Sequence, residues 1–135
     1  MTTELFALAD RVEAAKAWDI ALDEAVAVAM GWQRPMLPGT CGPDYEGRNR
    51  YEWHDTDQQP RGFYPPQFTA SLDAALTIYD AIRHIEWIDG GVEAYCFGGT
   101  FDSAVYLGYA VTAPLALTAA ALRAHASRVG DGRGE

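Results

Sequence analysis

One segment of the sequence, residues 104–111, is apolar on both of the faces that a β-strand presents. One face would carry Val105, Leu107, Tyr109 and Val111, and the other Ala104, Tyr106, Gly108 and Ala110. Successive side chains of a strand point to opposite sides of the sheet, so neither side of this strand suits contact with water. Strands of this kind are typical of sheets that are covered on both faces. The segment therefore predicts a three-layer α/β/α sandwich.

The other predicted strands come before this segment. Residues 48–55 (RNRYEWHD) alternate well enough for one strand. Residues 84–97 contain two alternating runs around Asp89-Gly90-Gly91, whose glycines supply the positive φ angles of a tight hairpin turn. A helix between the first strand and the hairpin would make the first two strands parallel and leave the rest antiparallel. We therefore expect an α+β fold with a mixed, mostly antiparallel sheet of about four strands.

Four segments show the apolar spacing of helices, which would form the outer layers. The first lies near the N-terminus. The second begins after Asp19, a good N-cap, and stops at Gly31. The third begins at Thr69 or Ser71, whose hydroxyls we interpret as helix caps and not as catalytic groups. The last covers residues 112–126.

The length of 135 residues predicts one domain, residues 1–126, followed by a flexible tail, residues 127–135. No apolar run approaches the roughly 18–20 residues of a membrane span, and the first residues lack the pattern of a signal peptide. We therefore expect a cytoplasmic protein that does not bind membranes. Cys41 and Cys96 form no CxxC pair, so we expect free thiols, no metal site and no cofactor.

Three segments carry a resemblance to a known family. They are LDEAVAVAMGW (residues 22–32), FTASLDAALTIYD (68–80) and TAPLALTAAALRAHA (112–126). In order and approximate spacing they resemble the small phage and prophage proteins of the phage ABA-sandwich domain family. The resemblance implies an α/β/α sandwich and a phage or prophage origin. It supplies no catalytic residues, because the shared segments are helices and their caps.

The proline- and glycine-rich stretch between Trp32 and Phe68 concentrates aromatic residues and arginines, which dominate the hot spots of protein interfaces. The predicted binding residues are Arg48, Arg50, Tyr51, Trp53, His54, Arg61 and Tyr64. The net charge of −9 disfavours direct binding of nucleic acid and favours a partner with a basic surface.

These features lead to a predicted function without catalysis. The leading hypothesis is a phage accessory protein that binds and inhibits a host defence protein, as an anti-CRISPR-like, counter-defence inhibitor would, by competing through its acidic surface. In the alternative, Arg48, Arg50 and Arg61 with Tyr51 and Trp53 capture a nucleotide signalling molecule. A homo-oligomer is compatible with either hypothesis.

Catalysis is the third hypothesis, in the form of a small hydrolase. Cys96 with His84 could form a nucleophile and its base, oriented by Asp102. Alternatively, Glu52 and His54 could hold a metal. The chain contains no GxSxG, GxxxxGK[ST], GxGxxG or HExxH string, so the common catalytic signatures are missing.

Overall fold

The computed structural model describes residues 2–33, 53–61, 64–79, 83–97 and 105–130. Within them the order of elements is α1 (Thr2–Ala14), α2 (Ile20–Ala29), α3 (Leu72–Ala75), β1 (Arg83–Ile88), β2 (Gly91–Phe97), β3 (Val105–Ala110) and α4 (Ala113–Gly130). The strands form one antiparallel sheet in the order β1-β2-β3. The prediction of an α+β fold is confirmed, whereas the parallel pair of strands expected in a mixed sheet is not seen in the described residues, where both strand pairs are antiparallel.

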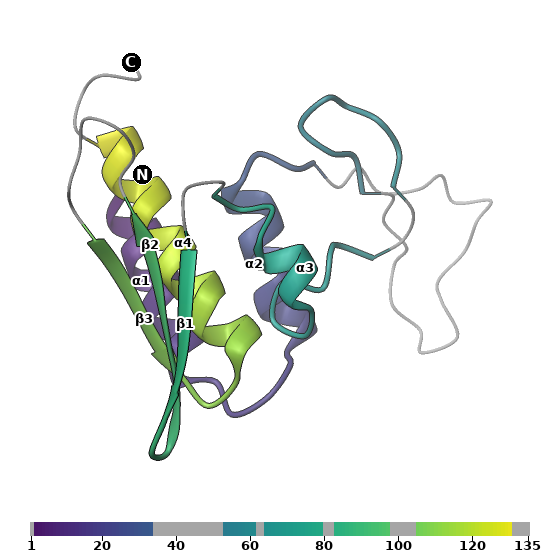
Figure 1. Cartoon of the computed structure of the whole chain (residues 1–135). Coiled ribbons are helices and arrows are strands. Elements are labelled where there is room, and N and C mark those ends of the chain that lie inside the picture. The colour runs from purple at the N-terminus through teal and green to yellow at the C-terminus, as the bar shows by residue number, and fades with distance from the viewer. Residues whose placement is uncertain (1, 34–52, 62–63, 80–82, 98–104, 131–135) are drawn as a thin grey trace.

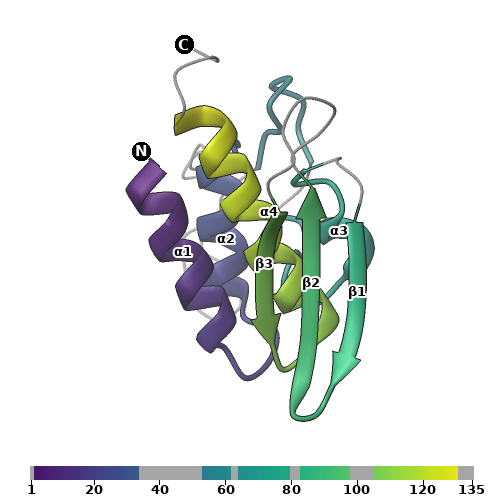
Figure 2. The ribbon, with the colours of Figure 1, turned by 60° about the vertical axis from the view of Figure 1, so that its left-hand side comes forward.

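Helix α4 lies at the centre of the molecule. It packs against β2 and β3 on one side and against α1 and α3 on others, with α2 and α3 on the side away from the sheet (Figures 1 and 2). Residues 115–122 are all at most 1% exposed, so this stretch is buried on every side and consists of apolar residues apart from Thr118. Its alanines allow this close packing.

Gly108 of β3 sets the distance between the sheet and α4. A Cβ atom at this position would lie only 2.7 Å from the backbone nitrogen of Ala120. Any side chain here would push α4 away from the sheet, which explains the glycine within an otherwise bulky strand. The inner face of β3 is therefore in direct contact with α4.

Local signals in the sequence correctly predicted the start and end of α2 and the hairpin turn. The side chain of Asp19 caps α2 by accepting hydrogen bonds from the backbone of Ala21 (2.8 Å) and Leu22 (3.4 Å), and Gly31 follows the helix with a φ of +96°. The β1–β2 hairpin turns at Asp89-Gly90, where Gly90 has a φ of +85°.

The three-layer arrangement and the fourth strand are not seen in the described residues. β3 is an edge strand, and its outer face is exposed to solvent. Of the strand predicted at 48–55, residues 48–52 lie outside the described residues, and His54 forms only isolated bridges, to Gln33 and Pro60. The alternation at 104–111 correctly indicated two apolar faces. It does not show whether the same chain covers both of them.

The third and last predicted helices have other bounds in the structure. α3 contains only Leu72–Ala75 and is capped by Ser71, one of the two predicted caps, whereas Thr69 hydrogen-bonds to Asp23 of α2. α4 continues to Gly130, so residues 127–130, predicted as part of a flexible tail, are helical. Within the described residues, no helix combines the length and apolar character that a membrane crossing requires.

Candidate functional site

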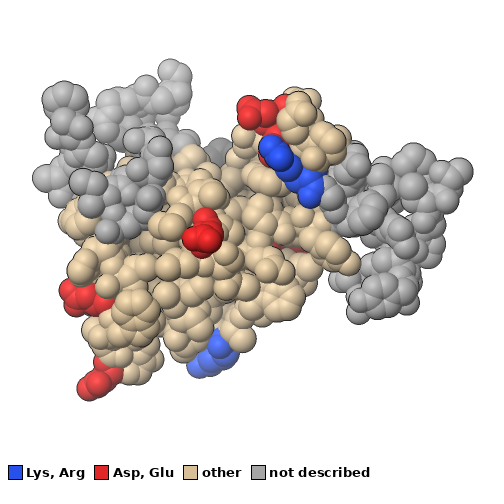
Figure 3. Space-filling model, turned by 45° about the vertical axis from the view of Figure 1, so that its right-hand side comes forward, with Lys and Arg blue, Asp and Glu red and all other residues tan. Residues whose placement is uncertain are grey.

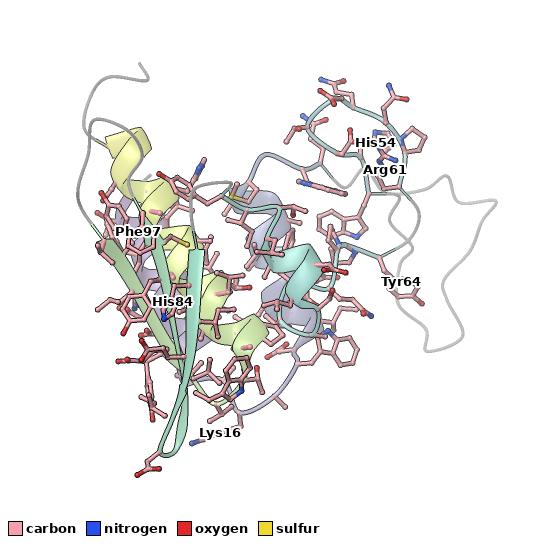
Figure 4. The ribbon with its side chains drawn as sticks, in the orientation of Figure 1. Lys16, His54, Arg61, Tyr64, His84 and Phe97 are labelled. Carbon is pink, nitrogen blue, oxygen red and sulfur yellow. The ribbon has the colours of Figure 1, made fainter. Side chains whose placement is uncertain are left out.

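The predicted binding residues do not form one site in the described structure. Arg48, Arg50 and Tyr51 lie outside the described residues. Trp53 is only 1% exposed and belongs to the core, so its ring is not available for a ligand. Figure 4 shows His54 and Arg61 on the loop of residues 53–61, on the other side of the molecule from His84 and Phe97 of the sheet.

Asp55 organises the loop that contains His54 and Arg61. One carboxylate oxygen accepts hydrogen bonds from the backbone of Asp57 and Gln59 (2.9 Å each), and the other contacts Nε of Arg61 at 2.7 Å. The Gln59 N–H and the Arg61 guanidinium lower the pKa of Asp55. The charge of Arg61 is therefore balanced within its own loop, which disfavours a role as a phosphate ligand.

An open hollow of about 470 Å³ lies beside this loop. It is lined by Trp32, Arg61, Tyr64, Pro65, Pro66, Gln67, Ser71 and Ala74. It brings together two of the predicted binding residues, Arg61 and Tyr64, and adds Trp32, which the prediction did not include. Rings and prolines dominate the lining, so the hollow suits an apolar group better than an anion.

The outer face of the sheet, which was expected to be covered, gathers several exposed apolar side chains of the described residues. Along β3 and just beyond it, Val105 (46% exposed), Leu107 (48%), Tyr109 (45%) and Val111 (44%) form a continuous apolar column. Half-buried Tyr95 and Phe97 of β2 extend it, and Phe97 lies opposite Val105. The signal in the sequence was the alternation at residues 104–111, whose second apolar face is not covered by any other element among the described residues.

Polar groups on this outer face lie toward β1. Glu86 of β1, Glu93 of β2 and Tyr109 of β3 are opposite one another in register. Glu93 accepts a hydrogen bond from the Tyr95 hydroxyl (2.8 Å), which raises the pKa of that phenol. His84 lies 3.0 Å from the carboxylate of Glu86. The outer face thus combines an apolar column with a neighbouring acidic strip, and we call the two together the open face.

The free edge of β3 is closed by two side chains from the helices. Glu13 of α1 accepts a hydrogen bond from the backbone N–H of Tyr109 (2.8 Å), and Arg123 of α4 donates one to the backbone oxygen of Leu107 (2.8 Å). The two side chains also pair with each other at 2.6 and 2.7 Å, and Arg123 reaches Asp10 at 2.7 Å. The hydrogen bond from Arg123 lowers the pKa of Glu13.

The proposed catalytic pair is ruled out by the sheet. Arg83, not His84, lies opposite Cys96, so His84 and Cys96 are on opposite faces. Cys96 carries a buried thiol under α4 and forms no disulfide, whereas His84 is exposed. Asp102 and Glu52 lie outside the described residues. Among the described ones, no group of three or more His, Cys, Asp or Glu side chains could hold a metal ion.

Asp23 is a buried carboxylate that sequence analysis missed. It is 0% exposed, and it accepts hydrogen bonds from Trp18 Nε1 (2.7 Å) and from both the backbone N–H and the hydroxyl of Thr69 (2.8 Å each). Burial raises its pKa, against the effect of these hydrogen bonds. These hydrogen bonds tie α2 to the segment before α3, which gives Asp23 a structural role.

Comparison of the chain with protein-family models, with curated proteins and with solved structures finds no match.

Proposed function

We propose that the protein acts without catalysis, by docking its open face on a partner protein and inhibiting it. The observation that carries this proposal is the column of four large apolar side chains on and beside β3, each 44–48% exposed. Contiguous apolar surfaces of this kind mark interaction sites in soluble proteins. A partner element on this face would supply the second outer layer of the α/β/α sandwich.

The charges of the open face specify the chemistry of the partner. Glu86 and Glu93 are adjacent in register, beside the apolar column, and the whole chain carries a net charge of −9. A partner surface with apolar side chains beside lysines or arginines would complement both parts of the face. This agrees with the hypothesis of a basic host protein, whereas the phage origin and the counter-defence role rest on the resemblance alone.

The alternative of a nucleotide ligand has less support. Its described residues are Arg61 and Tyr64 in the open hollow, and the guanidinium of Arg61 is already paired with Asp55 at 2.7 Å. A phosphate would have to compete with that carboxylate for the same charge.

A matched pair of variants tests the proposed surface. Leu107 (48% exposed, open face) and Val28 (49%, on α2) are equally exposed apolar residues in different places. We expect Leu107→Glu to lower the amount of partner captured from host lysate by about tenfold or more, the effect of losing a contact worth at least about 1.4 kcal/mol. Val28→Glu should capture as much as the wild type.

Capture is measured by quantitative mass spectrometry, after circular dichroism has shown that both variants are folded. Equal capture by Leu107→Glu and the wild type would contradict the proposal. If Tyr64→Ala alone abolished capture, or if the purified protein bound a nucleotide in calorimetry, the hollow and not the open face would be the site.

A further inference from the structure

The two edges of the sheet differ in what they offer to another strand. The edge of β3 is occupied by Glu13 and Arg123, which hydrogen-bond to the backbone of Tyr109 and Leu107. β1 is the strand at the other edge, as Figure 2 shows. Among the described residues, β2 alone is hydrogen-bonded to the backbone of β1. An edge with unpaired backbone groups is a template for strand addition.

The side chains of β1 are also unusually exposed for a strand of a packed sheet. Trp87 is 72% exposed, the highest value among the large apolar residues that the structure describes. It is opposite Val92, which is buried, and so belongs to the inner face. Its exposure arises because β1 packs on β2 and has no extensive contact with a described helix. An uncovered tryptophan beside an open strand edge is typical of an interface.

On the outer face, β1 carries two groups of complementary chemistry. His84 and Glu86 contact each other at 3.0 Å, and their side chains are 54% and 52% exposed. An exposed pair of this kind contributes little to stability by itself. Because His84 and Glu86 lie two residues apart on an edge strand, however, the strand is complementary to an antiparallel copy of itself.

We propose that β1 pairs antiparallel with β1 of a second copy around a two-fold axis at Ile85, which forms a dimer with one continuous six-stranded sheet. With Ile85 opposite Ile85, His84 of each copy lies opposite Glu86 of the other. Each imidazole then has a carboxylate beside it on its own strand and another across the interface. Opposite charges or donor–acceptor pairs directly across an antiparallel pair are stabilising.

The neighbouring registers lack this complementarity. Placing the axis at Glu86 would put two like carboxylates opposite each other, and placing it at His84 would put two imidazoles opposite each other. Two carboxylates in that position repel each other, and two imidazoles forgo the carboxylate partner that the axis at Ile85 provides. A shift of one residue would place outer-face side chains opposite inner-face ones, which antiparallel pairing does not allow. The positions of His84 and Glu86 thus select one register.

The dimer does not depend on the proposed function, but it would enlarge the open face. Three strands of about six residues span roughly 20 by 14 Å, or about 300 Å² in projection. Each partner in a typical stable complex buries about 800 Å². Two open faces side by side on one sheet would double the surface offered to a partner.

Charge reversal at the two positions tests the dimer and its register together. We expect light scattering with size-exclusion chromatography to show a dimer for the wild type. His84→Glu alone places two carboxylates opposite each other, and Glu86→Lys alone places an ammonium group opposite an imidazole, so each should weaken dimerisation by about tenfold or more. An equimolar mixture of the two variants should restore the dimer, because the new carboxylate of one copy then faces the new ammonium group of the other.

Restoration in the mixture separates the proposed contact from a folding defect, which a second damaged copy could not repair. Glu93→Lys makes the same charge change on the central strand and should remain dimeric. Leu107→Glu should also remain dimeric, so loss of partner binding and loss of the dimer are distinguishable. A monomeric wild type, no restoration in the mixture, or a dimer lost in Leu107→Glu but kept in His84→Glu would overturn the proposal; the last would indicate face-to-face packing.

Discussion

At the scale of single residues, Arg123 connects three elements. Its guanidinium donates to Glu13 and Asp10 of α1 and to the backbone oxygen of Leu107 in β3, all within 2.8 Å, while it belongs to α4. The side chains of Arg123 and Glu13 are 19% and 26% exposed, so the pair is well shielded from water. Removing one partner of such a shielded pair leaves the other charge uncompensated, which costs more than it would on the open surface.

Replacing Glu13 should reveal this contribution and its dependence on pH. We expect Glu13→Gln to lower the free energy of unfolding by about 1–3 kcal/mol near neutral pH, because it weakens the hydrogen bonds to Arg123 and Tyr109. The pKa of Glu13 is lowered from 4.5 in the folded protein. Its stabilising contribution is therefore present above that value and is lost as the pH falls through the folded-state pKa.

Urea unfolding at a series of pH values measures the effect. The difference between the wild type and Glu13→Gln should shrink in acid. The control is Asp89→Asn in the exposed hairpin turn, where asparagine suits the turn equally well, and it should differ little from the wild type at any pH. A difference for Glu13→Gln that stayed constant from about pH 7 to about pH 3 would show that the charge of Glu13 is not what stabilises the fold.

At the scale of elements, the predictions that succeeded were those with local causes. Asp19 and Gly31 bound α2, and Gly90 turns the hairpin, because each acts on backbone groups within a few residues. Thr69 could not be interpreted correctly in the same way. Its hydroxyl donates a hydrogen bond to Asp23, 46 residues earlier in the chain. No pattern in the neighbouring residues predicts a partner so far away in the sequence.

The candidate site also combines features that the sequence predicts with features that depend on distant contacts. The apolar character of both faces of β3 could be predicted from the alternation. Which face a helix covers depends on where α4 packs, and the close approach of Gly108 to Ala120 determines that position. The sequence therefore predicted the apolar residues of the open face, but not their exposure to solvent. Trp53 was misjudged for the related reason that an aromatic residue suits a core as well as an interface.

The different roles of Thr69 and Ser71 can be separated by mutation. We expect Thr69→Val to lower the free energy of unfolding by about 1.5–3 kcal/mol, because it removes a buried hydrogen bond to a carboxylate while keeping the side-chain volume. Ser71→Ala should lower it by about 1 kcal/mol, through the loss of one cap on a short helix. Thermal and urea unfolding measure both, and equal effects would contradict the assignment.

At the scale of the whole molecule, the chain carries a net charge of −9. On the side shown in Figure 3, acidic side chains lie apart from one another, and most of the described surface carries neither Asp and Glu nor Lys and Arg. No single acidic patch dominates the described part of that side. The charge should therefore guide a basic partner from a distance, while the apolar column determines the final contact.

This division predicts how partner binding responds to salt. Affinity should fall as the ionic strength rises from about 0.1 to about 0.5 M, because the distance over which exposed charges interact falls from about 10 Å to about 4 Å in this range. Glu93→Gln on the open face should make that dependence shallower, and Asp73→Asn on α3, away from the sheet, should not. Surface plasmon resonance with the captured partner measures the slopes, and an unchanged slope for Glu93→Gln would place the electrostatic contact elsewhere.

The closed edge of β3 also decides how large an assembly of this chain can become. In the proposed dimer the two β1 strands meet at the centre, so both ends of the six-stranded sheet are β3 edges, each occupied by Glu13 and Arg123. No further copy can be added at either end. The assembly is then a closed pair and not an open fibre, although its strands are apolar enough to propagate one.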